Sequence, residues 1–122
     1  MGNPVVHFEI ISKNAEGLRK FYGAAFDWQI DAPMTGANVP DYTMVHPNQN
    51  GGIAGGIGTA PEGYDGHLTF YVGVPDVAAA LRKVQSLGGK IMRGPDEVPG
   101  GPIIGQFEYP QGHVVGLVQT AD

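Results

Sequence analysis

Two histidines that open similar segments of the chain are the side chains best suited to chemistry. His7 begins the segment His7-Phe8-Glu9-Ile10, and about sixty residues later His67 begins His67-Leu68-Thr69-Phe70. Imidazole titrates near neutral pH and binds divalent transition metals, so the pair could act in acid–base chemistry or hold zinc, iron, nickel or manganese. If the two segments form equivalent strands, we expect both side chains to face one shared cavity.

Glu9 extends this set because residues two apart on a strand share a face and lie roughly 7 Å apart at the backbone. It could approach a metal ion held by His7, act as a base, or pair with a neighbouring polar group. A histidine on a strand is also often a hydrogen-bonded structural residue. The predicted small-molecule pocket combines polar groups with an apolar lining: His7, Glu9, His67, Thr69, Ile53, Ile57, Val114 and Val118.

Further matching segments indicate that the chain is a duplication. Leu18-Arg19-Lys20 recurs as Leu81-Arg82-Lys83, and residues 51–59 match residues 112–120. Each half reads as an alternating strand, an amphipathic helix and three more strand-like segments. The sequence therefore predicts an α+β fold of two tandem βαβββ modules, about residues 4–60 and 66–120, within a single domain.

The expected elements follow from local patterns. Asn14 and Asp76 are predicted N-caps, and Gly88 is expected to end the second helix in a left-handed conformation. The apolar stripe of the first helix, which includes Phe21 and Phe26, is expected in the core together with Trp28. Strands are predicted in both modules, at 5–12, 27–32, 41–46 and 52–59, and at 67–74, 90–93, 103–109 and 113–119.

Composition excludes several classes of protein. The 122 residues contain no cysteine, which rules out a disulfide scaffold, a thiolate zinc site and a cysteine nucleophile. Twelve acidic residues against seven basic ones give a formal charge of −5, so nucleic acid is not an expected partner. The sequence shows no apolar run of the roughly 20 residues that span a bilayer and no secretory signal, which predicts a cytoplasmic protein without membrane contact.

Taken together, the motifs resemble the vicinal oxygen chelate superfamily, the group of glyoxalase I, bleomycin-resistance proteins and extradiol dioxygenases. The resemblance rests on four segments: His7 in Val6-His7-Phe8-Glu9-Ile10, Phe21-Tyr22 before Phe26-Asp27-Trp28, Val74-Pro75-Asp76-Val77 with Gly88-Gly89, and Tyr109-Pro110-Gln111-Gly112-His113. It implies paired βαβββ modules related by a pseudo-twofold axis, a cupped mixed sheet around a cavity, and a homodimer.

The resemblance also implies where a metal would bind, since metal-dependent members take ligands from the first and last strands of each module. The first-strand positions match His7 and His67, but the last-strand positions, which usually hold a carboxylate, match Gly55 and Gly116. Catalytic zinc normally takes three protein ligands plus water. We therefore expect metal-free binding of a small molecule with no cofactor, the glycines allowing a ligand or backbone to approach closely.

Two alternatives stay open at this point. One is a divalent-metal-dependent lyase, isomerase or dioxygenase that uses His7 and His67. A variant of this enzyme reading is a metal-free enzyme that uses Glu9 or a histidine as base. The other alternative is a structural or regulatory dimer without a small ligand. The sequence does not identify a substrate.

Overall fold

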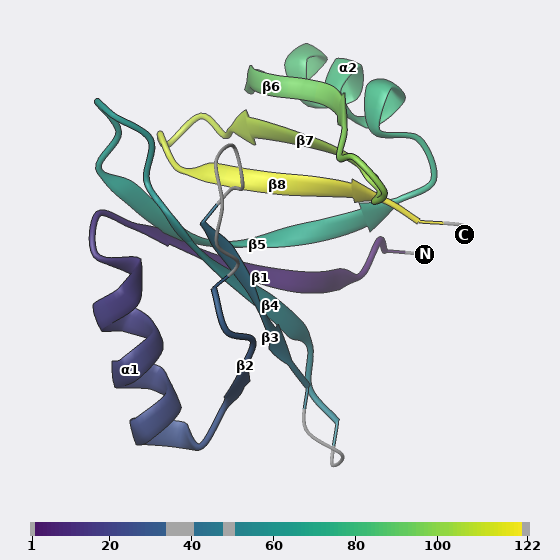
Figure 1. The fold of residues 1–122 in the computed structure, drawn as a ribbon. Coiled ribbons are helices and arrows are strands. Elements are labelled where there is room, and N and C mark those ends of the chain that lie inside the picture. Colours follow the sequence, from purple (N-terminus) through teal and green to yellow (C-terminus); the bar gives the residue numbers. More distant parts are fainter. Residues whose placement is uncertain (1, 34–40, 48–50, 121–122) are drawn as a thin grey trace. The chain divides into compact units, whose positions relative to one another are not determined.

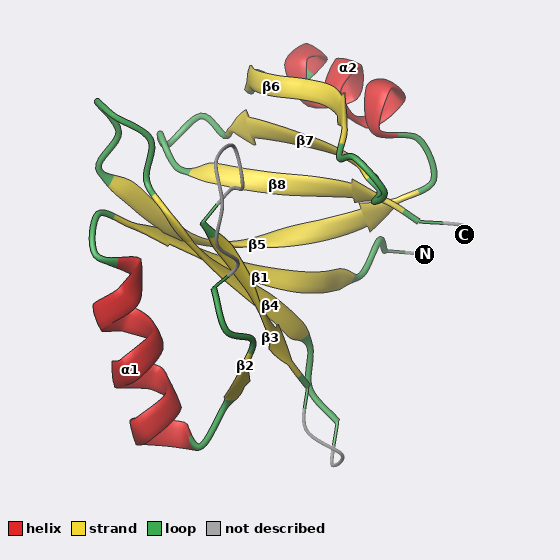
Figure 2. Ribbon diagram, in the orientation of Figure 1, coloured by secondary structure: helices red, strands yellow, loops and turns green. Residues whose placement is uncertain are grey.

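The computed structural model describes residues 2–33, 41–47 and 51–120. The chain forms two compact units, His7–Leu68 and a second unit that joins the first six residues to Thr69–Asp122. Each half of the chain has the element order βαβββ, which confirms the α+β class and the two predicted modules (Figures 1 and 2). The pseudo-twofold relation and the shared cavity stay predictions.

Four strands build the sheet of the first module. They are β1 (Val5–Ser12), β2 (Gln29–Ile30), β3 (Tyr42–His46) and β4 (Ala54–Thr59), in the order β2-β3-β4-β1. Strand β4 pairs parallel with β1 and antiparallel with β3, so the sheet is mixed. Strand β2 is shorter than the predicted segment 27–32, and it begins later because Asp27 adopts a left-handed conformation (φ 57°) as the C-cap of the preceding helix.

Helix α1 (Ala15–Phe26) begins at the predicted cap. The side chain of Asn14 accepts a hydrogen bond from the backbone N–H of Gly17 at 3.0 Å, which satisfies one of the otherwise unpaired donors of the first turn. The helix covers one face of the sheet, where the buried core residues of this unit gather: Ile10, Ala15, Val45 and Ile57.

The aromatic residues of α1 do not all reach this core. Tyr22 and Trp28 pack against it with their rings stacked at 5.0 Å, as expected. Phe21 and Phe26, which we expected to be buried, are 62% and 60% exposed. The apolar stripe of α1 is thus wider than the strip of the helix that contacts the sheet.

The second module has strands β5 (Gly66–Val74), β6 (Lys90–Glu97), β7 (Ile103–Glu108) and β8 (Val114–Gln119) in the order β5-β8-β7-β6. Helix α2 (Val77–Ser86) is capped by Asp76, whose side chain accepts from the N–H of Ala79 at 3.1 Å. Gly88 follows with φ 101°, as predicted. The core of this unit consists of Val74, Val77, Leu81 and Leu117. In the described ranges no helix has the length and apolar character needed to cross a membrane.

The register of the repeat differs by two residues from the predicted one. His7 lies eight residues before the first residue of α1, whereas the residue eight before the start of α2 is Thr69, not His67. Strand pairing agrees, since Glu9 lies opposite Gly56 in the first module and Tyr71 lies opposite Gly116 in the second. Thr69 is therefore the counterpart of His7, and identical residue type made the two histidines look equivalent.

Candidate functional site

The two faces of the first-module sheet differ in character. Ile10 lies opposite Ile57 in the parallel pairing, and both point toward α1. Because side chains alternate along a strand, His7 and Glu9 lie on the other face, beside Gly56 of β4. The polar candidates of the first module therefore occupy the face that α1 does not cover.

Glu9 and His67 meet on this face. The Oε2 atom of Glu9 lies 2.7 Å from Nε2 of His67, and the two side chains are only 7% and 12% exposed. The other ring nitrogen of His67, Nδ1, is hydrogen-bonded to the hydroxyl of Tyr64, which follows the turn before β5. Both nitrogens of His67 are thus engaged within the His7–Leu68 unit.

His7 has its own partner on the same face. Its Nε2 atom lies 2.9 Å from the hydroxyl of Tyr42 on β3. Burial lowers the pKa of His7 from its ordinary value of 6.5, and the negative charge of Glu9 raises it by a smaller amount. The His7 imidazole is therefore neutral at pH 7. We call His7, Glu9, Tyr42, Tyr64 and His67 the polar cluster.

The glycines of β4 support this cluster in an unexpected way. Gly55, which we expected on the ligand side, lies opposite Phe8 on the α1 side, and a Cβ there would meet the Phe8 ring at 2.1 Å. Gly56 is the residue on the cluster face, and a Cβ there would lie 2.0 Å from the Tyr42 hydroxyl. The ring of Tyr42 therefore fills the space in which we expected a ligand to approach the glycine.

The second module also has a tyrosine over a last-strand glycine, but this tyrosine comes from its first strand, β5, whereas Tyr42 comes from β3. Gly116 lies on the face opposite α2, and the ring of Tyr71 covers it, since a Cβ there would meet that ring at 2.5 Å. The Tyr71 hydroxyl accepts from Nε2 of Gln106 at 2.9 Å. Both last-strand glycines on these faces thus lie under a tyrosine.

The remaining predicted pocket residues are distributed between the units. Thr69 donates through Oγ1 to the carbonyl of Val114 at 2.7 Å. Val118 lies opposite Gly73 in the pairing of β5 with β8, and Gly73 is on the same face of β5 as Thr69. Ile53 precedes β4 and is 44% exposed. Ile57 is 0% exposed within the core under α1, so it cannot line a pocket on the cluster face. Whether a ligand contacts the others stays a prediction.

Metal-ligating side chains do not gather into a metal centre among the residues that the structure describes. Across the ranges 2–33, 41–47 and 51–120, no group of three or more histidine or carboxylate side chains is placed to hold a metal ion. The positions of Gly56 and Gly116 offer no donor, and His67 uses both nitrogens in hydrogen bonds. The described residues therefore do not fit a site with three protein ligands and a water.

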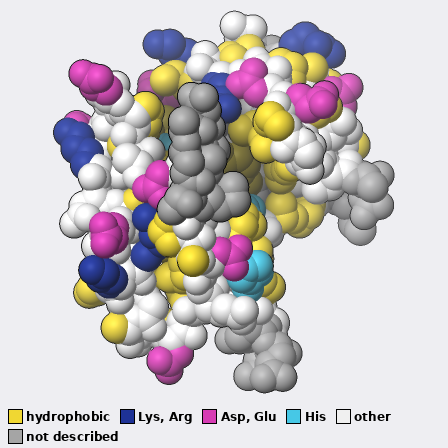
Figure 3. Space-filling model, in the orientation of Figure 1, with side chains coloured by type: hydrophobic (Ala, Val, Ile, Leu, Met, Phe, Trp, Pro, Cys, Tyr) yellow, Lys and Arg dark blue, Asp and Glu magenta, His cyan; other side chains and the backbone are white. Residues whose placement is uncertain are grey.

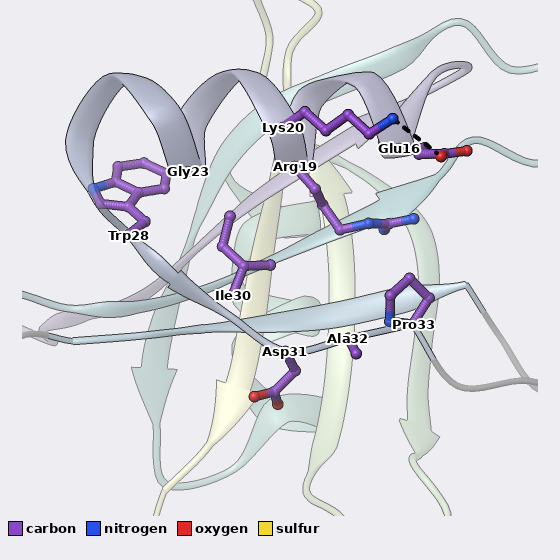
Figure 4. Close-up of a pocket in the computed structure, with 9 residues that line it drawn as sticks. All are labelled: Glu16, Arg19, Lys20, Gly23, Trp28, Ile30, Asp31, Ala32 and Pro33. Carbon is purple, nitrogen blue, oxygen red and sulfur yellow. Dashed lines mark ion pairs between the residues drawn. The ribbon is translucent and has the colours of Figure 1, made fainter.

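A groove of about 660 Å³ lies elsewhere, on the α1 side of the first module (Figure 4). It runs along the helix and the segment that follows it, and its lining includes Arg19, Trp28 and Ile30. The charged groups at its edge are paired with each other or with the sheet, as Lys20 is with Glu16 at 3.5 Å. Figure 3 shows charged side chains of both signs over α1. The groove contains no member of the polar cluster.

Sequence reasoning identified three members of the cluster and missed Tyr42 and Tyr64. Tyr42 alternates with Met44 and His46 along β3, but the pattern alone does not decide which face of the sheet carries them. Tyr64 lies in the predicted link between the halves, where no periodicity applies. Tyr64 lies two residues before β5 and His67 is the second residue of that strand, so nearness in the sequence was the available indication that the two groups meet.

The paired βαβββ modules, each with one helix over one face of a mixed sheet, define the class of fold. The chain belongs to the Glyoxalase/Bleomycin resistance protein/Dioxygenase superfamily, whose sequence profile matches residues 5–117. This finding confirms the resemblance to the vicinal oxygen chelate group. No curated protein matches the sequence.

Solved structures agree on the fold. A hypothetical protein of Bacillus halodurans C-125 superimposes with a TM-score of 0.69 at 10% identity, covering 100% of this chain and 97% of that one. Streptomyces coelicolor methylmalonyl-CoA epimerase in complex with 2-nitronate-propionyl-CoA gives 0.65 at 16% identity, with 98% and 95% covered. A superfamily member from Vibrio splendidus 12B01 gives 0.65 at 11% identity, with 98% and 100% covered. At such identities the likeness concerns the fold alone.

Proposed function

We propose that the polar cluster binds a small organic molecule without a metal ion. The observation that carries this proposal is the full engagement of His67, which bonds Glu9 through Nε2 and Tyr64 through Nδ1. A metal ion would have to displace one of these bonds. An organic ligand that hydrogen-bonds to the cluster would leave both bonds of His67 in place. A few polar groups of the cluster would then set the orientation of that ligand.

The charge of the cluster supports the same proposal. Glu9 is 6% exposed and is held by an imidazole, while His7 is kept neutral by its burial. A buried carboxylate is stable only when it is paired or hydrogen-bonded, and here protein groups supply that pairing. The site therefore needs no cation to complete it.

The test is a thermal-shift ligand screen with and without exhaustive chelation, alongside metal analysis of the native protein. A ligand at 100 times its dissociation constant should add about 2.7 kcal/mol to the free energy of unfolding. We expect this shift to survive chelation and to fall in His67→Gln. The control is His46→Gln, because His46 pairs with Asp31 at 2.7 Å outside the cluster.

A different result would favour a metalloenzyme. Stoichiometric binding of a divalent metal that is lost in both His7→Ala and His67→Ala would overturn the metal-free proposal. It would support the lyase, isomerase or dioxygenase alternative. Chelation that leaves ligand binding intact would exclude that alternative for the ligand tested.

The assembly and location are also proposals. We propose a homodimer, on the family resemblance, and a location in the cytoplasm, with which a sequence that contains no cysteine is compatible. Light scattering coupled to size-exclusion chromatography would measure the mass of the particle in solution. A monomer at micromolar concentration would contradict the dimer.

A further inference from the structure

Three side chains of the polar cluster form a continuous hydrogen-bonded chain from a buried carboxylate to a partly exposed phenol. Glu9 lies at the inner end, His67 in the middle, and Tyr64 at the outer end. The two bonds use the two different ring nitrogens of His67. A proton that enters at the phenol can therefore reach the imidazole, whose charge the carboxylate then stabilises.

The positions of the protons follow from the chemistry of the groups. An ionised carboxylate only accepts hydrogen bonds. In a neutral His67 the ring proton is therefore on Nε2, which donates a hydrogen bond to Glu9. Nδ1 is then an acceptor, and the Tyr64 hydroxyl donates to it. Burial and the negative charge of Glu9 raise the pKa of Tyr64 above its ordinary value of 10.0, which keeps the phenol protonated at neutral pH.

Hydroxyl, imidazole and carboxylate are thus arranged in the order that supports proton transfer in enzymes. The imidazole takes the hydroxyl proton, and the carboxylate fixes the imidazole tautomer and stabilises the imidazolium that forms. Roles of this kind are recognised by geometry rather than by fold or position in the sequence.

We propose that Tyr64, His67 and Glu9 form a proton relay that removes a proton from a bound small molecule carrying a weakly acidic hydroxyl group. This inference rests on the small-molecule site proposed above. The ligand O–H bond breaks and its proton passes to the Tyr64 oxygen, while the Tyr64 proton passes to Nδ1 of His67. The products are a ligand oxyanion and an imidazolium paired with Glu9, so atoms and charge balance without an oxidant or reductant.

The other charges of this unit favour a ligand that binds in its neutral form. Within residues 7–68 the Lys and Arg side chains are all paired with carboxylates: Lys13 with Asp65, Arg19 with Asp41, and Lys20 with Glu16. None of these three cations takes part in a described bond of the polar cluster. The positive charge that balances a ligand anion would then arise on His67 itself, by the transfer.

The chain offers a matched control for this relay. Tyr109 and His113 form a second pair in which a phenol is hydrogen-bonded to Nδ1 of an imidazole, but this pair is exposed on the turn before β8. Tyr109→Phe therefore removes the same kind of bond without touching Glu9 or His67.

The experiment uses 4-nitrophenol as the probe, because its anion absorbs visible light and its neutral form does not. Binding is measured by equilibrium dialysis, and the ionised fraction of the bound probe by absorbance as a function of pH. In the wild type we expect the bound probe to ionise with an equilibrium constant at least tenfold greater than that of the free probe. Tyr64→Phe and His67→Gln should abolish this shift in the probe that remains bound, whereas Tyr109→Phe, which lies outside the polar cluster, should keep both the affinity and the shift.

Nitrogen NMR of the histidine side chains gives a second readout. We expect both ring nitrogens of His67 to be protonated when the probe is bound, and only Nε2 when it is absent, at the same pH. This reading needs no variant, so it stands even if a substitution prevents folding. Unchanged nitrogen shifts of His67 on binding would overturn the relay.

The remaining outcomes separate the relay from the site. If the bound probe ionises like the free one, or if Tyr64→Phe retains the shift, the relay is wrong and the binding site stands. If 4-nitrophenol fails to bind while other ligands stabilise the protein through the cluster, the weak-acid class is wrong. If no ligand binds at the cluster, the proposed function fails, and the relay fails with it.

Discussion

The Oε2 atom of Glu9 lies 2.7 Å from Nε2 of His67, although 58 residues separate the two along the chain. Glu9 is in the middle of β1, and His67 is the second residue of β5. One hydrogen bond therefore connects the first strands of the two modules within a single compact unit. It leaves both side chains largely out of solvent.

A double-mutant cycle tests the strength of this pair. Glu9→Leu alone or His67→Phe alone should lower the free energy of unfolding by about 1–3 kcal/mol, because each removes one side of a buried hydrogen bond. The double variant should lose less than the sum, with a coupling of about 0.5–3 kcal/mol. Urea denaturation at pH 7 measures all four proteins, and strictly additive losses would contradict a stabilising contact.

Substitution of Gly56 tests whether the Tyr42 ring needs the space above this glycine. In Gly56→Ala the added Cβ would lie 2.0 Å from the Tyr42 hydroxyl, so the ring must move, and this displaces the hydroxyl that bonds His7. We expect a loss of about 1–3 kcal/mol in the free energy of unfolding, as for other overpacked sites.

The control for that substitution is the same change in a Tyr42→Ala background. There the added methyl group meets no ring, and the cost should fall to a few tenths of a kcal/mol. An equal cost in both backgrounds would mean that the glycine is needed for its backbone rather than for the space above it. Ligand binding at the cluster should weaken only where Tyr42 is displaced or absent.

The sequence was informative where local rules decide the structure. Alternation in residues 5–12, the caps Asn14 and Asp76, and the left-handed Gly88 each depend on neighbours in the chain, and each was confirmed. The order βαβββ follows from these local signals because each element carries its own periodicity. The pairing of Glu9 with His67 depends instead on which strands meet, and no local pattern contains that information.

Register and burial were the features that local patterns could not fix. A shift of two residues keeps every side chain of a strand on the same face, so the match of His7 with His67 looked as good as the true match with Thr69. A shift of one residue changes the face, and this is why Gly55 was assigned to the ligand side in place of Gly56. Ile57 was misassigned for the same reason.

Arg19 and Lys20 are adjacent on α1 and provide a matched test of buried against exposed charge. The Arg19 side chain is 11% exposed and donates to Asp41 at 3.1 Å and to Thr43 at 3.4 Å, which joins the helix to β3. Lys20 and Glu16 form a pair with side chains 79% and 76% exposed.

We expect Arg19→Met to lower the free energy of unfolding by about 1–3 kcal/mol, because it leaves the buried Thr43 hydroxyl and the Asp41 carboxylate without this donor. Lys20→Met should stay within about 0.5 kcal/mol of the wild type, as is usual for exposed ion pairs. Thermal and urea unfolding would measure both variants. Equal losses would show that the contacts of Arg19 contribute no more than an exposed charge.

The pKa of His7 predicts how stability depends on pH. Because burial lowers this pKa below 6.5 in the folded protein, the unfolded chain binds the proton first as pH falls. The stability due to the neutral imidazole is therefore complete above 6.5 and is lost as pH falls toward the folded-state pKa. In His7→Gln this loss is absent, so the difference in unfolding free energy between wild type and variant should shrink or reverse on acidification, by at most about 1.4 kcal/mol per pH unit. Urea titrations of both proteins between roughly pH 7.5 and 5 span this window. A difference in unfolding free energy that stays constant would mean that folding does not change the pKa of His7.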